Sequence, residues 1–442
     1  MKKLFILLLF WCLFSQGFCQ FTAMPLNYPH DGSAYMSWFT SIVDANTVWV
    51  GTVRQGTSGY LPYASAVKTD DGGNTWQFFP IPVTGTPWIQ HLAAWDANTC
   101  YYLFTDGSVG GGSVWKTSDG GTTWTKKTTT QFAGGWSNFI HLFSQDTCLV
   151  MGDPSNGYFE IQLSDDGGGT WTRVPSTDMP AIISGETGLS GEYSAIGNNI
   201  WFGTSKGRCF KSIDKGLHWT VSTVASGYGQ SVCFSDALHG FFYAPGTSTF
   251  YYKTDDGGST WSQKSIKPGN FFGHMCRVPG LNNAYVLCTW KNTLYDSMYV
   301  FSSYDFFNTM TVLDSNITNS SGFPNFNTNN IGWLGGSYYY YHDIYKFNGV
   351  LTSVPQKGFN AEAIEIWPNP SSEKSSVKIH SVNNNCLLRI LDFSGKEVGT
   401  LNIGKSMDVV DLNANQYKSG VYLIQLVHGN MVICNKKWIV IH

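Results

Sequence analysis

The chain has 442 residues and a formal net charge of −3, and only 13% of its residues are charged, whereas 16% are aromatic and 48 are glycine. This composition favours many short strands joined by tight turns over helices. It excludes a nucleic-acid partner recognised through basic surfaces, because the sequence has no Lys- or Arg-rich run and does not interleave aromatic with basic residues.

The first 19 residues are typical of a secretory signal peptide. Lys2 and Lys3 precede the apolar stretch 4–14, which is too short to span a bilayer. We expect export with removal of residues 1–19 and no transmembrane segment. Lipidation of Cys19 is the weaker alternative, since a bulky phenylalanine precedes it.

Eight cysteines remain after that cleavage, an even number that permits disulfides in an exported chain. Cys276 and Cys288 flank an expected hairpin tip and are candidates to face each other. Cys100 and Cys148 occupy matching strand positions, where we favour small buried residues over a disulfide.

One eight-residue motif recurs along the chain, five times clearly and once in worn form. Its clear copies carry Ser or Thr first, Asp third, Gly fifth and Trp last, and the central aspartates are spaced 42 to 49 residues apart. The copies occupy residues 69–76, 117–124, 164–171, 212–219, 254–261 and, in worn form, 303–310. Repetition at this period predicts a β-propeller of four-stranded blades.

Each copy has the composition of a tight turn. Glycines supply positive φ angles, the central Asp and leading Ser or Thr accept hydrogen bonds from turn amides, and the closing Trp is expected to pack over the turn. The motif lacks the spaced oxygen ligands and terminal Glu of an EF-hand, so we expect it to build turns and not to bind calcium.

A second element, an apolar strand after a small polar turn, recurs seven times. The copies are at residues 44–51, 96–102, 145–150, 197–203, 236–242, 282–286 and 329–335. Seven such strands favour seven blades, with six or eight left open. The last blade, about 326–350, lacks an outer strand, which we expect segment 21–28 to supply, so that no sheet edge stays exposed.

These repeats resemble the Asp-box (BNR) family over about residues 21–352. Gly152, Asp153 and Pro154, with the strand that follows, resemble the photosystem II assembly-factor-like branch. The family also includes sialidases, xyloglucan-active glucanases and sortilin-type receptors, so the resemblance implies the fold and leaves the function open.

The period stops after residue 357, and a different pattern begins at residue 364. Five candidate strands at 377–380, 387–393, 409–412, 421–427 and 438–441 predict a small antiparallel sandwich. The expected organisation is therefore a signal peptide at 1–19, a propeller at 20–357 and a β-sandwich at 358–442.

Four ordered landmarks mark this last module, at residues 367–370, 392–396, 419–422 and 436–440. Their order and spacing resemble the type A C-terminal sorting domain of the type IX secretion system of Bacteroidetes. The resemblance implies that the type IX machinery is a partner, and that the protein passes through the periplasm to be released or attached at the outer-membrane surface. An ordinary immunoglobulin-like accessory domain is the alternative.

The sequence gives weak candidates for catalysis. Asp106, Asp153 and Glu192 lie outside the motif copies, near expected blade ends, where two carboxylates suit an inverting glycosidase if they lie roughly 6.5–9.5 Å apart. Capping of turns by each acid is the favoured alternative. A sialidase needs clustered arginines, and two of the four propeller arginines, Arg173 and Arg208, adjoin motif copies away from the expected central mouth.

Aromatic and polar residues cluster where each blade's first strand is expected. Since the first strand of a propeller blade lines the channel, they are candidates to ring one mouth and bind a sugar or peptide, with packing between blades as the alternative. These candidates are Tyr35, Trp38, Trp88, His91, Trp136, His141, Tyr228 and His274. A zinc site from the three histidines lacks a dense ligand motif, so we expect no metal and no cofactor.

The sequence thus favours a secreted or surface propeller that binds a glycan or protein ligand without catalysis. The main alternative is a polysaccharide-active glycoside hydrolase with an axial acid pair. A scaffold in protein assembly is a third hypothesis, which rests on the resemblance alone.

Overall fold

A computed structural model describes residues 20–26, 34–56, 59–106, 110–227, 231–243, 250–265, 272–291, 297–318, 323–335, 343–351, 364–379, 386–392, 396–404, 409–428 and 431–442. The chain divides into two compact units, Met1–Asn308 with Val312–Ser353, and Thr309–Thr311 with Val354–His442. None of the described residues belongs to a helix long and apolar enough to cross a membrane.

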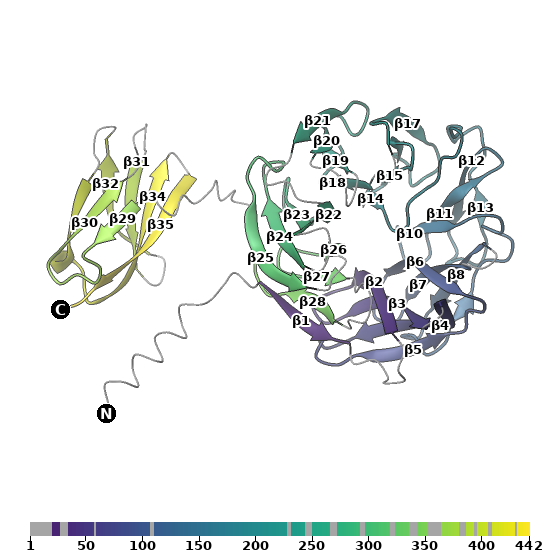
Figure 1. The fold of residues 1–442 in the computed structure, drawn as a ribbon, viewed down its shortest axis with the longest axis horizontal. Helices are drawn as coiled ribbons and strands as arrows, with labels where there is room; N and C mark the ends of the chain where they lie inside the picture. The colour runs from purple at the N-terminus through teal and green to yellow at the C-terminus, as the bar shows by residue number, and fades with distance from the viewer. Residues whose placement is uncertain are drawn as a thin grey trace. The chain divides into compact units, whose positions relative to one another are not determined.

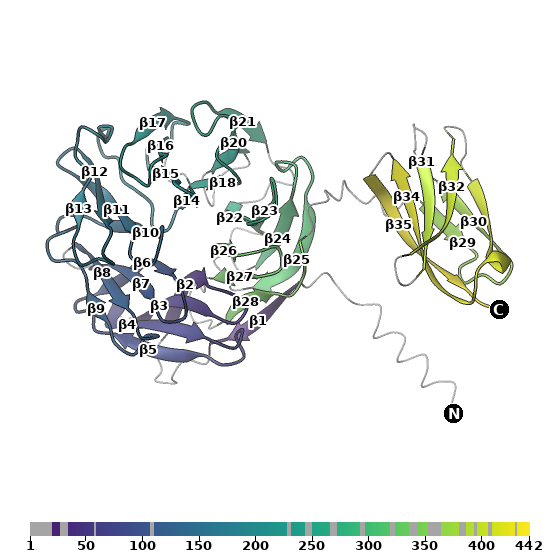
Figure 2. The same cartoon turned by 180° about the vertical axis from the view of Figure 1, so that it is seen from behind.

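The first unit is a propeller of antiparallel sheets around a hub (Figures 1 and 2). Its described residues form seven four-stranded sheets, which accords with the seven apolar strands of the repeats. Six sheets run outward from the hub in chain order: β2 (Ala34–Ile42), β3 (Val48–Gly56), β4 (Gly59–Thr69) and β5 (Gln77–Ile81); β6 (Pro87–Ala94), β7 (Cys100–Asp106), β8 (Gly112–Thr117) and β9 (Thr125–Lys126); β10 (Ser137–Leu142), β11 (Cys148–Ser155), β12 (Tyr158–Ser164) and β13 (Thr172–Arg173); β14 (Tyr193–Ile196), β15 (Asn199–Gly203), β16 (Arg208–Ser212) and β17 (Thr220–Thr223); β18 (Ser231–Phe234), β19 (Gly240–Tyr243), β20 (Phe250–Thr254) and β21 (Ser262–Ser265); β22 (Phe272–Arg277), β23 (Tyr285–Trp290), β24 (Ser297–Ser303) and β25 (Thr311–Thr318).

The seventh sheet joins the two ends of the propeller sequence. It contains β26 (Phe323–Phe326), β27 (Gly332–Gly335) and β28 (Asp343–Phe347), and its outer strand is β1 (Phe21–Pro25). Strand β1 runs antiparallel to β28, with Phe21 opposite Phe347 and Pro25 opposite Asp343. The expected closure by the N-terminal segment is therefore confirmed.

The motif copies are turns held by their own side chains, as expected. In the first copy, the Thr69 hydroxyl donates to Oδ1 of Asp71 at 2.8 Å and accepts from the Gly73 amide at 2.8 Å. Asp71 also accepts from the amide and hydroxyl of Thr75, at 2.9 and 2.6 Å. Hydrogen bonds from the Thr75 side chain and backbone are the main cause that lowers the pKa of Asp71 to about 2.

Lysines near the ends of third strands connect neighbouring sheets. Nζ of Lys346 donates to the carbonyl of Gly72 in the next sheet at 2.8 Å, and Lys116 donates to that of Gly167 at 3.4 Å. Gly72 has a φ of +72°, a backbone conformation that L side chains rarely adopt, so this turn position favours glycine.

The closing tryptophans cover their own turns, as expected, and they also pack between sheets. The Trp219 indole, for example, donates to the carbonyl of Gly216 in its own turn at 2.8 Å. The Trp124 ring lies edge-on to Trp49 of the preceding sheet, with centroids 6.3 Å apart, and Trp76 likewise meets Trp333 at 5.9 Å. These rings therefore bury apolar surface at the boundary between sheets.

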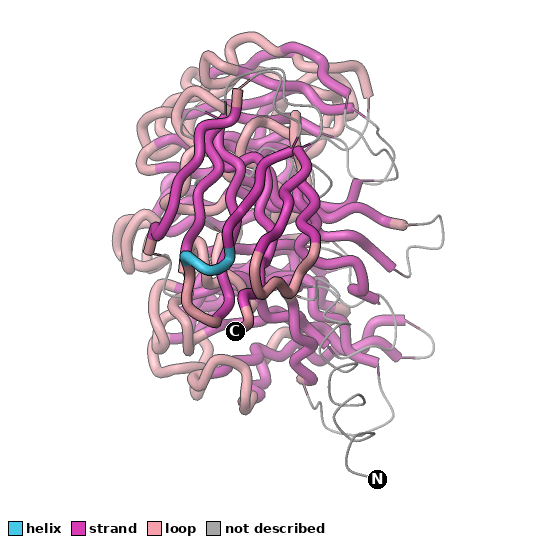
Figure 3. The backbone as a smooth tube through the Cα atoms, turned by 90° about the vertical axis from the view of Figure 1, so that its left-hand side faces the viewer, coloured by secondary structure: helices cyan, strands magenta, loops and turns pink. Residues whose placement is uncertain are grey.

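The second unit is a two-sheet sandwich, as expected. One sheet has the order β29-β30-β33 and the other the order β32-β31-β34-β35. Its elements are β29 (Ile364–Trp367), β30 (Lys374–Ile379), β31 (Cys386–Leu391), β32 (Glu397–Ile403), β33 (Val409–Asn413), a short 3-10 helix η1 (Ala414–Gln416), β34 (Gly420–His428) and β35 (Met431–Val440), and Figure 3 shows the strands in magenta and η1 in cyan.

The five-strand expectation for this unit was incomplete. It missed two edge strands, β29 and β32. The residues of β32 are mostly exposed, so its sequence lacks a clear alternation of apolar and polar residues. Trp438 lies fully buried in the core between the sheets and donates its indole hydrogen to Oγ of Ser375 at 2.8 Å.

Seven cysteines whose side chains the structure describes are free thiols: Cys100, Cys148, Cys209, Cys233, Cys276, Cys288 and Cys386. Cys100 and Cys148 are buried, as expected. Cys276 lies opposite Val286, two positions before Cys288, so the proposed facing pair is wrong. The hairpin register places the two cysteines diagonally rather than directly opposite.

Candidate functional site

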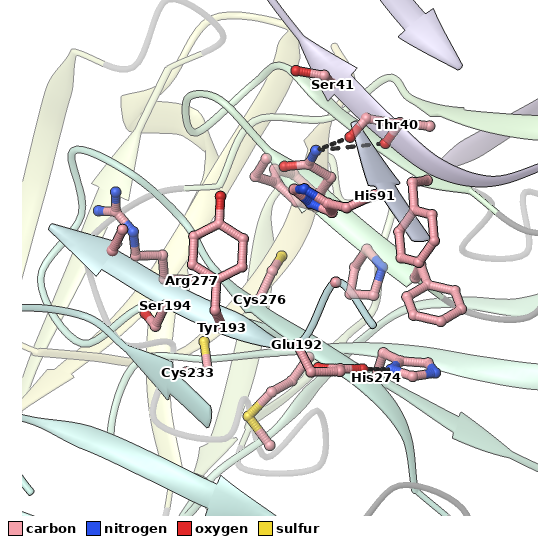
Figure 4. Close-up of a pocket in the computed structure, with 18 of the residues that line it drawn as sticks. Thr40, Ser41, His91, Glu192, Tyr193, Ser194, Cys233, His274, Cys276 and Arg277 are labelled. Carbon is pink, nitrogen blue, oxygen red and sulfur yellow. Dashed lines mark hydrogen bonds and ion pairs between the residues drawn. The ribbon is translucent and has the colours of Figure 1, made fainter. Parts of the chain in front are cut away.

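The hub of the propeller contains a cavity of about 330 Å³ (Figure 4). First strands of all seven sheets contribute residues to its lining, which include Thr40, Leu92, His141, Ser194, Cys233, His274 and Asn325. This arrangement confirms the expectation that first strands line the channel.

Strand register defines one layer of small and polar residues around the cavity. Each member of the layer pairs with a residue on the second strand of its sheet. That residue pairs on its other side with a third-strand residue, which is the one just before a motif copy or, in the last sheet, Lys346. The members are Ser41, Ala93, His141, Ser194, Cys233, Cys276 and Asn325, one from each sheet, and all of them line the cavity.

An aromatic layer lies next to this polar layer. Phe39 contacts His91 of the second sheet edge-on at 5.6 Å and Phe323 of the last sheet at 5.5 Å. Phe323 in turn stacks on His274 of the sixth sheet, with centroids 3.6 Å apart. The hub therefore offers ring faces and edges beside small polar groups.

The segment 186–192, before β14, spans the hub on the side of the cavity opposite the motif turns. The Gly188 amide donates to Oδ1 of Asp153 at 2.9 Å, and the Ser190 hydroxyl donates to Oε1 of Gln90 in the second sheet. An added Cβ on Gly191 would lie 2.3 Å from the Phe39 ring in the first sheet, so a glycine allows this close approach.

Hydrogen bonds fix the proton positions of the two histidines near Tyr193. Nδ1 of His91 accepts from the Ile140 amide at 3.4 Å, so a neutral His91 carries its hydrogen on Nε2. The Tyr193 hydroxyl donates to the Ile140 carbonyl at 3.2 Å and lies 3.3 Å from Nδ1 of His141. That hydroxyl can accept from Nδ1, which leaves Nε2 of His141 as an acceptor.

Both of these histidines are held neutral. Burial, with a smaller contribution from His141, lowers the pKa of His91 to about 3. Burial and then the charge of Arg277 lower the pKa of His141 to about 4. At neutral pH the pair therefore supplies one donor and one acceptor without positive charge.

Glu192 reaches the cavity and faces His274. Its Oε1 lies 2.8 Å from Nδ1 of His274, as the dashed line in Figure 4 marks. Of the three candidate acids, Glu192 lines the cavity, whereas Asp106 and Asp153 do not.

The other two candidate acids hold loops in place. Asp106 accepts from the Thr86 hydroxyl at 3.2 Å. Asp153 accepts from the Asn138 side chain at 2.9 Å and from the Gly188 amide. Burial raises the pKa of Asp153, while these two hydrogen bonds oppose the rise.

The aromatic candidates divide into separate groups. His91, His141 and His274 line the cavity, whereas Trp88 and Trp136 form an edge-on pair at 6.0 Å outside its lining, and Trp136 is 38% exposed. Tyr228 and the side chains of Tyr35 and Trp38 lie outside the described residues.

The described residues hold no group of three or more His, Cys, Asp or Glu side chains arranged to bind a metal ion. Arg173 contacts the Tyr158 ring and Arg208 pairs with Glu186, so neither reaches the cavity. Arg277, in contrast, does line it. Sequence reasoning missed Arg277 and Tyr193, because neither belongs to a repeated motif and their positions follow only from the strand register.

Comparison with known proteins decides the nature of the second unit. Residues 365–441 match the family model described as a secretion system C-terminal sorting domain. This unit is a type IX sorting domain. The protein is therefore exported, and is secreted or attached to the cell surface.

Solved structures support the propeller fold of the first unit. A structure described as "YCF48 bound to D1 peptide" is 14% identical with a TM-score of 0.54, covering 75% of this chain and 96% of its own. YCF48 from Cyanidioschyzon merolae is also 14% identical with a TM-score of 0.53, covering 75% and 99%. An ancestral GH74 enzyme reaches a TM-score of 0.48 at 12% identity, covering 92% and 60%. No curated protein matches in sequence.

Proposed function

We propose that this exported protein is a binding protein that takes a glycan at the hub cavity of its propeller. The observation that carries the proposal is the pair of layers around that cavity, one aromatic and one of small polar residues. Aromatic faces beside fixed donors and acceptors suit the apolar faces and hydroxyl groups of sugars. The neutral His91 and His141 add a donor and an acceptor to this surface.

A glycoside hydrolase is the second candidate, favoured by the raised pKa of the half-buried Asp153. Both Asp106 and Asp153 lie outside the cavity lining, and each accepts hydrogen bonds that hold neighbouring loops. Glu192 faces His274. These contacts favour structural roles for the acids over a catalytic pair.

A glycan array tests the binding proposal, followed by calorimetric titration of the glycans that bind. We expect His141→Ala to weaken binding about tenfold, since it removes a polar contact inside the cavity. Trp95→Ala is the control, because Trp95 is 44% exposed and does not line the cavity. Equal loss in both variants, or no glycan bound at all, contradicts the proposal.

The hydrolase alternative has its own assay, release of reducing sugar from a panel of polysaccharides. If the parent chain turns over a polysaccharide and one acid variant loses that turnover, the hydrolase replaces the binding proposal. The variants are Asp106→Ala, Asp153→Ala and Glu192→Ala. A Trp136→Ala variant locates the site: if it, and not His141→Ala, loses binding, the ligand lies on the Trp88–Trp136 pair. Capture of peptides without glycans would indicate a protein ligand.

A further inference from the structure

One cationic side chain in the hub stands without an acidic partner. Arg277 ends β22 and lines the cavity, and no ion pair joins it to any residue that the structure describes. Arg208, at the start of β16 in the fourth sheet, instead forms a buried ion pair with Glu186. Among the described residues that line the cavity, Glu192 is the one acid, and it faces His274.

The charge of Arg277 acts across the hub. It lowers the pKa of His141 on the third sheet, and it opposes the rise in the pKa of Cys233 on the fifth sheet that burial causes. Figure 4 shows Arg277 together with Tyr193 and Ser194 at one side of the cavity. The positive charge of Arg277 therefore acts on cavity-lining groups of other sheets, and not on its own sheet alone.

Hydroxyl donors accompany this cation. Oγ of Ser41 accepts from the Ala94 amide at 2.9 Å, and Oγ of Ser194 accepts from the Phe234 amide at 3.0 Å. Each of these bonds uses a lone pair and leaves the hydroxyl hydrogen to donate. Both serines line the cavity. Ser194 lies at the same side of the cavity as Arg277 (Figure 4), and a cation beside a hydroxyl hydrogen is a set of donors that suits a carboxylate.

From this arrangement we propose that the hub cavity binds an acidic glycan, with the carboxylate of a uronic acid residue held by Arg277. The inference rests on the proposed function and specifies its ligand class. A sugar is favoured over a peptide terminus because the Tyr193 ring lies at the same side of the cavity as Arg277 (Figure 4), so that one monosaccharide can present its carboxylate to the cation and an apolar face to the ring.

The test is calorimetric titration of the full exported chain with glucuronate and galacturonate, compared with glucose and galactose. We expect the uronates to bind at least about tenfold more tightly than the neutral sugars, and this preference to shrink as salt rises. Arg277→Gln should remove the preference, and Arg277→Lys should retain part of it. Arg389→Gln, which changes the net charge equally on the exposed surface of the sorting domain, should leave it intact.

The outcomes separate this inference from the proposed function. If neutral glycans bind, His141→Ala weakens them and Arg277→Gln changes nothing, the acidic-glycan inference fails while the binding function stands. If peptides with a free carboxyl terminus bind and their amidated forms and the uronates do not, Arg277 serves a peptide ligand and the inference is wrong. If no sugar binds under any condition, both fail.

Discussion

Glu186 and Arg208 form a buried ion pair at the base of the segment that spans the hub. Nε of Arg208 donates to Oε1 of Glu186 at 2.9 Å, a second bond joins Nη2 to Oε2, and the Thr204 hydroxyl donates to Oε1 at 2.6 Å. Both residues are at most 9% exposed. The pair therefore holds the start of a segment whose end lines the cavity.

This geometry predicts a strong and asymmetric effect of mutation. Arg208→Met leaves the Glu186 carboxylate buried without its partner, and we expect the free energy of unfolding to fall by about 3–5 kcal/mol. The double variant Arg208→Met/Glu186→Leu should recover most of that loss, since it leaves no uncompensated charge. Urea unfolding of the two single variants and the double variant measures the coupling. Additive losses would contradict the interpretation.

Closure of the propeller gives a second prediction. Phe21 is 2% exposed, and its ring centroid lies 5.2 Å from that of Phe347. Phe21→Ala should lower the free energy of unfolding by about 3–5 kcal/mol, because it opens a cavity at the seam. Ala23→Ser, at an exposed position of the same strand, is the matched control. A similar denaturation midpoint for both variants would show that the seam contributes little.

The turns formed by the motif copies predict a loss of stability in acid. The pKa values of Asp71, Asp166 and Asp256 are lowered to about 2. Hydrogen bonds within the turn are the chief cause for the first two residues. For Asp256, burial raises the pKa, but hydrogen bonds, first those from Thr260, outweigh it. Because the folded pKa lies below the unfolded value, their contribution is complete above about pH 4 and disappears as the pH falls towards 2. Melting temperatures measured from pH 5 to 2 should fall less steeply for the triple Asp→Asn variant than for the parent chain.

The hub histidines predict a separate pH dependence at higher pH. The folded pKa values of His91 and His141, about 3 and 4, lie below the ordinary value of 6.5. The unfolded chain therefore binds more protons than the folded chain between about pH 4 and 6, so stability falls as the pH falls through that range. The slope should be at most about 1.4 kcal/mol per pH unit for each histidine.

Histidine titration followed by NMR checks this prediction directly. Resonances of His91 and His141 should stay in the neutral form down to about pH 5, whereas a His91→Phe variant should unfold with a shallower pH dependence. A His91 resonance that titrates near pH 6.5 would show that water reaches the ring freely.

The repeats made much of the fold predictable from sequence. Motif spacing and the apolar strands predicted the propeller, and the missing outer strand of the last repeat predicted the role of segment 21–28, because closure is a requirement of the architecture. The edge strand β32 escaped prediction, since its exposed residues follow no clear period.

The site was only partly predictable. First-strand positions placed His91, His141 and His274 near the hub, and Glu192 was expected near a blade end; all four residues line the cavity. Ser190 and Gln90 form a hydrogen bond although they are 100 residues apart in sequence. No local sequence pattern therefore predicts that segment 186–192 spans the hub. The effect of Arg277 on the pKa of His141 likewise follows from the fold and could not be predicted from the sequence.

The seam between β1 and β28 also bears on how such a ring can change during evolution. A stretch of DNA that encodes one repeat does not encode one sheet at the seam, because strands from opposite ends of the propeller sequence complete it. Duplication or loss of a repeat elsewhere alters the circumference while leaving this junction intact. Conversely, a circular permutant cut within one of the motif turns and rejoined at the seam would keep every strand pairing. The propeller should therefore tolerate moving its N-terminus to another turn more readily than losing strand β1.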